Sequence, residues 1–287
     1  MKQYLDLLRY VYEHGETLES RAVLQSDGSR PRTRSVFGYQ CRYDLRQGFP
    51  LVTTKYVPFR QVAAELCWFL SGSTNIAGLH KYNVRIWDEW SDENGDLGPI
   101  YGKQWRRWDA EFDGNFGEDP DRYDYDQIEW LIRSIECVVK NPSDSTSRRL
   151  LLTSFNPGEA DWRTPTACHT LCQLSVRNGR LHSHLYQRSG DLFLGVPWNI
   201  ACYAALTHLL ADRCSLGVGD FIHSFGDAHI YENHLPQVEE QLKREPLPLP
   251  TLSIRPGYDP TLKAMSPDDF VLHGYQHHPK LTAEVAV

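Results

Sequence analysis

The sequence lacks the marks of several large protein classes. No apolar run approaches the roughly 18 residues that a membrane span needs. Residues 1–6 do not show the charged-then-apolar order of a signal peptide. No internal repeat, low-complexity linker or break in composition divides the 287 residues. We therefore expect no membrane partner and one domain that covers residues 1–287.

An excess of positive charge is also missing. The chain has 30 Lys and Arg against 37 Asp and Glu, which gives a formal net charge of −7. Broad nucleic-acid binding needs a basic face, so we expect no nucleic-acid partner. A local group of arginines can still bind a small anion despite this overall charge.

Cysteine is present, but not in the pattern of a disulfide framework or a zinc site. The seven cysteines are scattered, odd in number and never spaced as CxxC pairs. This pattern favours free thiols in a reducing cytoplasm and predicts no bound metal.

Hydrophobic spacing predicts a mixture of helices and strands. Helical spacing is found over residues 2–14, 60–70, 127–140 and 200–211. Strand-like patterns are found over residues 35–45, 149–155, 171–176, 181–187 and 249–255. The polar residues 20–34 are predicted to form a loop, and the acidic residues 109–126 a surface excursion. One mixed α+β domain is the simplest fold for these elements.

Cys168 is the most informative residue for chemistry. It precedes His169, and a polar run at 187–199 supplies Arg188 among other polar groups. A nucleophilic thiol needs nearby positive charge to lower its pKa, and Arg188 is the candidate cation. An inert buried thiol is the alternative interpretation of Cys168, and it is the one we prefer for Cys172.

Glu65 lies within an apolar helical stretch, where an ionised carboxylate is costly. It is either a member of a salt bridge or a proton-handling group in a cavity. Burial raises a carboxyl pKa toward values useful for proton transfer, which favours the second role.

Several motifs occur together in the order found in one enzyme family. They lie at residues 48–55, 65–70, 86–90, 98–106, 147–149, 168–169, 187–199, 219–221, 227–231 and 285–287. Over nearly its whole length the chain resembles the folate-dependent, cysteine-nucleophile thymidylate synthase family. Pyrimidine-nucleotide hydroxymethylases are the nearest relatives of that family. The resemblance implies a mixed sheet flanked by helices, with the sheet packing at a homodimer interface.

The resemblance also implies catalytic roles. Cys168 would add to C6 of a pyrimidine, and Arg188 would support its thiolate. Glu65 and Tyr101 would handle protons, whereas His169 would be structural.

Nucleotide binding follows from the same resemblance. Arg21 and Arg188 would bind the phosphate with Ser189, and Arg148 and Arg149 would reach into the partner's site across the dimer interface. The other implied contacts to the nucleotide are Gly190, Asp191, Asn199, His229 and Tyr231. The amide of Asn199 can donate to O4 and accept from N3–H, which suits uracil, whereas a carboxylate there would favour cytosine.

The implied folate site combines one carboxylate with an apolar wall. Asp191 would bond the pterin, Lys55 would lie near the cofactor, and Ala286 and Val287 would close over it as a lid. The wall that stacks on the rings would consist of Ile86, Trp87, Trp90, Gly195 and Trp198.

The sequence departs from the family pattern at both ends of this site. Residues 22–34 replace the usual phosphate loop with a longer segment, so Arg30 or Arg32 could take the place of Arg21. Four residues differ from those that relatives commonly carry: Tyr56, Pro58, Ala167 and Phe225. Trp198 stands where phenylalanine is common.

The resemblance implies conversion of dUMP to dTMP with 5,10-methylenetetrahydrofolate, which becomes dihydrofolate. The alternative is a 5-hydroxymethylase acting on dUMP or a ribonucleotide such as UMP or CMP. It would use the same folate without hydride transfer. A regulatory nucleotide-binding or RNA-binding protein is a third hypothesis, disfavoured by Cys168 and the negative charge.

Overall fold

The computed structural model describes residues 1–108, 125–159 and 166–286 as a single α+β domain. Its main sheet has the order β1-β2-β6-β5-β4-β3, and β7 and β8 form a second, two-stranded sheet. Neighbouring strands are antiparallel except for the parallel pair β5 and β6. The strands are β1 (Glu16–Leu18), β2 (Thr33–Asp44), β3 (Leu151–Thr153), β4 (His169–Arg177), β5 (Arg180–Asp191), β6 (Gly217–Tyr231), β7 (Thr251–Ile254) and β8 (Phe270–His273).

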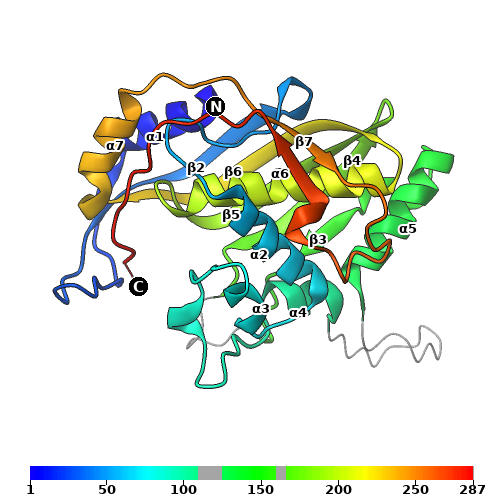
Figure 1. Ribbon diagram of the computed structural model, residues 1–287, viewed down its shortest axis with the longest axis horizontal. Helices are drawn as coiled ribbons and strands as arrows, with labels where there is room; N and C mark the ends of the chain where they lie inside the picture. The colour runs from blue at the N-terminus through cyan, green and yellow to red at the C-terminus, as the bar shows by residue number, and fades with distance from the viewer. Residues whose placement is uncertain (109–124, 160–165, 287) are drawn as a thin grey trace.

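Helices pack over one face of the main sheet and around its lower edge (Figure 1). The α-helices are α1 (Lys2–His14), α2 (Phe59–Ser71), α3 (Ala77–His80), α4 (Tyr101–Arg106), α5 (Gln127–Lys140), α6 (Gly195–Arg213) and α7 (Leu235–Leu242). The 3₁₀ turns are η1 (Leu45–Gln47), η2 (Asp88–Trp90), η4 (Ser145–Arg148), η5 (Glu232–His234) and η6 (Pro267–Asp269).

The central helix α6 is buried nearly all round, because it lies between the sheet and α2. On the sheet, alternate residues of β5, such as Leu181 and Leu185, are fully buried on the α6 side. Trp105, Tyr203 and Phe69 fill the space at the lower end of this core. Such burial of large side chains is the main favourable term in holding the elements together.

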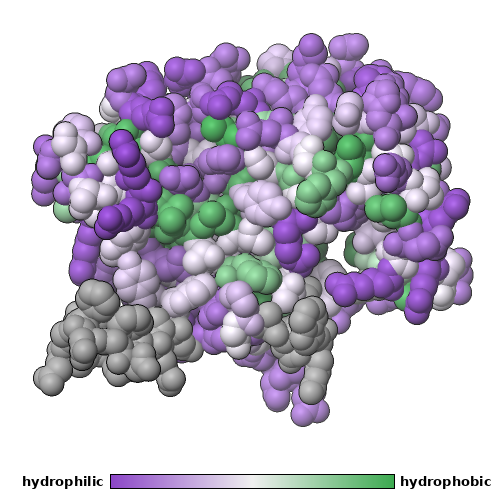
Figure 2. Space-filling view, turned by 180° about the vertical axis from the view of Figure 1, so that it is seen from behind, coloured by the Kyte–Doolittle hydropathy of each residue, from purple (hydrophilic) through white to green (hydrophobic). Residues whose placement is uncertain are grey.

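The opposite face of the sheet carries exposed apolar side chains. Tyr186 on β5 and Leu171 on β4, which are partners in the sheet, are exposed there. A cavity of about 390 Å³ on this face is lined by residues that include Arg42, Arg148 and His184. Viewed from the rear, the surface shows several apolar patches between polar residues (Figure 2). Exposed apolar groups of this kind often mark a contact surface.

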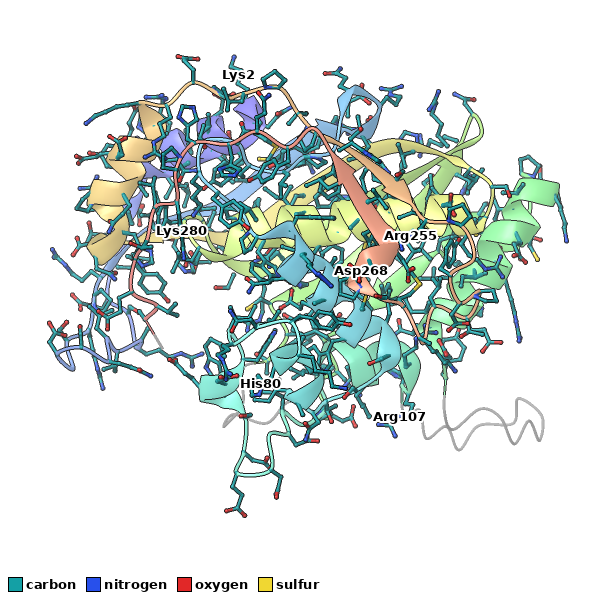
Figure 3. The ribbon with its side chains drawn as sticks, viewed as in Figure 1. Lys2, His80, Arg107, Arg255, Asp268 and Lys280 are labelled. Atoms are coloured by element: carbon teal, nitrogen blue, oxygen red, sulfur yellow. The ribbon has the colours of Figure 1, made fainter. Side chains whose placement is uncertain are left out.

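The second sheet packs on α6 through β7, and the turn η6, which precedes β8, packs on α2. Figure 3 shows Asp268, in η6, beside α2, where its carboxylate lies 3.1 Å from the Arg60 guanidinium. Both side chains are more than half exposed, so the pair adds little stability of its own. Within the described residues, no helix is both long and apolar enough to cross a membrane.

The predicted α+β class is confirmed, as are the helices at 2–14, 60–70 and 127–140. The predicted strands at 171–176 and 181–187 are also confirmed, although both extend further than predicted. The strand predicted at 149–155 is only three residues long, and that predicted at 249–255 only four. The predicted loop at 20–34 ends where β2 begins at Thr33.

Two larger differences concern the elements that carry the site. Helix α6 begins at Gly195 rather than at residue 200, so Trp198 lies in its first turn and Asn199 immediately after it. The long strand β6 was not predicted, because its many Gly, Asp and His residues mask the alternation. Most of the predicted excursion at 109–126 lies outside the described residues.

Candidate active site

Cys168 lies immediately before β4 and is held by backbone hydrogen bonds. The Tyr101 hydroxyl accepts from the Cys168 amide N–H at 2.9 Å and from the His169 N–H at 3.4 Å. The Cys168 carbonyl accepts from the Arg188 N–H at 2.9 Å. The register of β4 and β5 shifts between His169 and Leu171, which is the kind of irregularity that turns a side chain toward a site.

Arg188 brings its guanidinium to the thiol. Its Nη2 lies 3.6 Å from the Cys168 Sγ, and it also donates to the Thr166 carbonyl at 2.6 Å. Its Nε donates to the Ala167 carbonyl at 3.1 Å. These bonds fix the cation beside the sulfur.

Two opposing effects act on the thiol. Burial is the larger effect and raises the pKa of Cys168 overall, whereas the positive charges of Arg188 and Arg21 oppose that rise. The thiolate is the nucleophilic form, so both arginines favour reactivity. A nucleophilic role for Cys168 stays a prediction, and the two arginines are the cations that it requires.

The Tyr101 hydroxyl is buried among aromatic rings beside Cys168. Burial raises its pKa well above the usual value, so the phenol keeps its proton. Because its oxygen already accepts from two backbone N–H groups, its own O–H remains the group that can donate.

Glu65 projects from α2 into the same region, and two indoles bind its carboxylate. The Nε1–H of Trp87 donates to Oε1 at 2.8 Å, and the Nε1–H of Trp198 donates to Oε2 at 2.7 Å. Burial raises the pKa of Glu65 to about 7, although both indole bonds oppose the rise. A carboxyl that titrates near neutrality suits proton transfer.

The amide of Asn199 is oriented by a buried chain of polar groups. Nε2 of Gln187 donates to its Oδ1 at 3.0 Å, and Nε2 of His223 bonds the Gln187 Oε1 at 2.9 Å. The side chain of His169 is also hydrogen-bonded to that of Asn199, and burial lowers the pKa of the His169 imidazole to about 4. The Asn199 carbonyl is therefore engaged by Gln187, which restrains the orientation of the amide.

The parallel pairing of β5 and β6 gathers several more polar residues at one end of the sheet. Ser189 is paired with Asp227 and Asp191 with His229. The rings of His229 and Tyr231 are 5.2 Å apart. Cys168 is near enough to Tyr231 to influence its pKa, which burial raises.

Gly190 packs against the Phe225 ring, next to the side chain of Gln187. A Cβ on Gly190 would lie 3.0 Å from Val196 Cγ2 and 3.2 Å from Phe225 Cδ1. The bulky Phe225 is therefore accommodated because residue 190 has no side chain.

Asp191 closes the turn into α6, since its Oδ1 accepts from the Phe193 N–H at 2.9 Å and from the Leu194 N–H. Lys55 lies beneath this turn. Its ammonium donates to the Phe193 carbonyl and sits 3.7 Å from the centre of the Phe193 ring. Lys55 is only 5% exposed, so a direct contact with a ligand stays a prediction.

The candidate phosphate arginines are not equivalent. Arg21 is exposed and acts electrostatically on Cys168. Arg32 pairs with Glu232 at 3.1 Å, and Arg30 is exposed. Arg148 ends η4 and lines the cavity on the open face of the sheet, and Arg149, which follows it, is exposed. Among the loop arginines, Arg21 is the one whose charge reaches the thiol.

Partly exposed aromatic rings border the Glu65 carboxylate. The Trp87 and Trp90 ring centres are 6.0 Å apart, and Ile86 beside them is 45% exposed. Trp198 and Gly195 lie in the first turn of α6 on the other side of Glu65. A planar aromatic ligand fits such a surface.

The C-terminal tail is bound to the loop that carries Arg21. Ala286 forms a β-bridge with Leu24, and the Glu284 carboxylate accepts from the Ser26 N–H at 2.8 Å and its hydroxyl at 2.6 Å. His234 also bonds the Glu284 carbonyl at 2.8 Å. Figure 1 shows the red C-terminal end beside this blue loop. Val287 lies outside the described residues.

The residues that orient the candidate site residues were not predicted from the sequence. Gln187 and His223 fix Asn199, and the carbonyls of Thr166 and Ala167 fix Arg188. Gln187, the first residue of the polar run at 187–199, was the one of these residues to which the sequence pattern pointed. Among the described residues, no three His, Cys, Asp or Glu side chains converge as they would around a metal ion.

A sequence model described as thymidylate synthase matches residues 2–287. The match covers essentially the whole chain, including every element that carries the site. The protein therefore belongs to the thymidylate synthase family and is a one-carbon transferase that acts on a nucleotide with a folate cosubstrate.

Proposed function

We propose that the protein methylates dUMP to dTMP, with 5,10-methylenetetrahydrofolate as the donor of both carbon and hydride. The observation that carries this proposal is the fixed amide of Asn199. Its Oδ1 is engaged by Gln187, and its N–H₂ group would then donate to the base. A donor there suits the O4 of uracil and opposes the amino group of cytosine.

The nucleotide phosphate would meet Arg21 and Arg188, with the Ser189 hydroxyl beside them. Both guanidiniums already act on Cys168, so the phosphate and the thiol would share one positive region. His229 and Tyr231, at the end of β6, would bind the sugar hydroxyl, and Gly190 and Asp191 would border the nucleotide from β5.

Cys168 would add as a thiolate to C6 of the pyrimidine, which makes C5 nucleophilic. Arg188 stabilises the thiolate, and the N–H₂ of Asn199 stabilises negative charge at O4. The Tyr101 hydroxyl, held against the Cys168 backbone, would use its remaining O–H to orient a water molecule that accepts the C5 proton. Glu65, with a pKa of about 7, would exchange protons around O4.

The folate supplies the one-carbon unit and, in methylation, the hydride. Its rings suit the partly exposed wall of Trp87, Trp90 and Trp198, and Asp191 offers a carboxylate for the pterin. Ile86, Gly195, Lys55 and the tail residues Ala286 and Val287 complete the proposed set. Closure of the tail over the site would exclude water, which favours hydride transfer over hydroxymethylation.

We also propose a homodimer formed through the open face of the sheet. Tyr186 and Leu171 expose apolar surface there, and Arg148 lines the cavity on the same face. Arg148 and Arg149 would then reach the partner's phosphate site.

A cytoplasmic location stays a prediction from the seven unpaired cysteines.

The test is an incubation of purified protein with methylenetetrahydrofolate and, separately, dUMP, dCMP, UMP and CMP. Mass spectrometry identifies the nucleotide product, and absorbance follows dihydrofolate. Methylated dUMP with equimolar dihydrofolate is the expected result. A hydroxymethylated nucleotide without dihydrofolate would instead assign the chain to the hydroxymethylases of the family.

A second expectation concerns Tyr101. The change Tyr101→Phe removes the acceptor of the Cys168 and His169 N–H groups and leaves two buried donors unpaired. It should lower the free energy of unfolding by about 1–3 kcal/mol and kcat by roughly 10²-fold. Thermal denaturation and steady-state kinetics measure the two effects. Tyr10→Phe, at an exposed position on α1, is the matched control. A full kcat in Tyr101→Phe would remove the phenol from the proton-transfer scheme.

A further inference from the structure

The carboxylate of Glu65 is bound at both oxygens by indole N–H groups from different parts of the chain. Trp87, next to η2, donates to Oε1, and Trp198, in the first turn of α6, donates to Oε2. Glu65 itself belongs to α2. One buried side chain therefore links three segments by its two oxygens.

The family resemblance assigns Trp198 only to an apolar wall, where phenylalanine is common. A phenylalanine ring supplies the same kind of packing but no N–H. The bond at 2.7 Å to Oε2 is thus a contribution of this chain's own tryptophan. Trp198 also precedes Asn199 on α6, so the bond connects the candidate pyrimidine-reading turn to the candidate proton-handling group.

The physical effect of this bond has a definite sign. Burial disfavours the charged form of Glu65, whereas a hydrogen bond donated to the carboxylate favours it. The titratable groups that face Glu65 from the other described elements are Tyr101 on α4 and Cys202 on α6. Burial raises the pKa of both groups, which are neutral. The two indoles are therefore the groups shown to stabilise the ionised carboxylate.

We propose that Trp198 is a positioning residue for Glu65, whose carboxylate it holds in a fixed orientation and stabilises in the ionised form through its indole N–H. The proposal rests on the proposed function of Glu65 as a proton-handling group. Trp87 alone would hold one oxygen and leave the carboxyl free to rotate about its last bond.

The test measures the titration midpoint of Glu65 through the indole N–H resonance of Trp87. It does not depend on catalytic turnover. The full-length protein is labelled with ¹⁵N at its tryptophans, and the indole N–H resonance of Trp87 is followed from acidic to alkaline pH without ligands. Trp87→Phe identifies that resonance by its loss. Glu65→Gln, which cannot ionise, should abolish its titration.

Trp198→Phe should raise the midpoint of the Trp87 titration by about one pH unit, because one of two donors to the anion is lost. Trp90→Phe is the matched control. It removes an indole in ring contact with Trp87 and leaves both Glu65 bonds in place, so its midpoint should equal that of the parent.

A second variant separates the loss of the indole N–H from the change in packing that Trp198→Phe also causes. Site-specific replacement of Trp198 by benzothienylalanine keeps the shape of the indole but has sulfur in place of N–H. It should give the same upward shift. A midpoint equal to that of the parent in the benzothienylalanine variant overturns the proposal, as does an equal shift in Trp90→Phe.

The outcomes separate this inference from the proposed function. If the midpoint rises as expected but the parent protein forms no product from any of the four nucleotides, the positioning by Trp198 stands and the proposed reaction fails. If product forms and the midpoint does not move, the reaction stands and the role of Trp198 is wrong.

Discussion

Cys168→Ser is expected to lower kcat by on the order of 10⁴-fold or more, with dUMP binding largely retained. A serine hydroxyl ionises far less readily than a thiol, even with Arg188 3.6 Å away. The phosphate arginines and Asn199 are unchanged in this variant, so the nucleotide still has its contacts. Single-turnover kinetics and calorimetric titration with dUMP measure the two quantities.

Cys172→Ser is the matched control for this loss. Cys172 lies four residues further on, in β4, where burial raises the pKa of its thiol to about 12. It should keep its turnover number, although a hydroxyl in an apolar position lowers stability. Turnover in Cys168→Ser comparable to that of the parent would exclude covalent catalysis by this residue.

Asn199→Asp is expected to reverse the preference between uracil and cytosine. A carboxylate still accepts the bond from the Gln187 Nε2, so its orientation is kept. It has no N–H for O4 and instead accepts from the amino group of cytosine. The kcat/KM for dUMP should fall by about 10²–10³-fold, and that for dCMP should exceed it.

Competition between dUMP and dCMP in one reaction, analysed by mass spectrometry, gives the ratio of specificities directly. Asn199→Ala serves as the reference, since it removes the donor without adding an acceptor. If the aspartate and alanine variants show the same preference, residue 199 does not read the base.

The sequence predicted those parts of the molecule that are determined by residues close together in the chain. The spacing of Tyr4, Leu7 and Leu8 is enough to place α1, and these residues are fully buried. The motifs spread from residues 48–55 to 285–287, taken in their order, were enough to assign the family.

Other features depend on contacts between distant residues. Strand β6 contains His223 and Asp220, which are polar in sequence but paired in the fold with Gln187 and Arg42. The bond from Trp198 to Glu65 joins residues 133 positions apart. Sequence indicated an aromatic ring at 198, but only the fold shows where its N–H points.

The bond between the C-terminal tail and the loop that carries Arg21 has a thermodynamic consequence. Ser26 and Leu24 bind the tail at Glu284 and Ala286, so the tail and this part of the loop become ordered together. A phosphate that orders the loop would lower the cost of docking the tail, and a folate held under the tail would lower the cost of ordering the loop. Because the coupling free energy is shared, nucleotide must strengthen folate binding by the same factor as folate strengthens nucleotide binding. The contacts between this longer loop and the tail would then couple the nucleotide and folate ends of the proposed site.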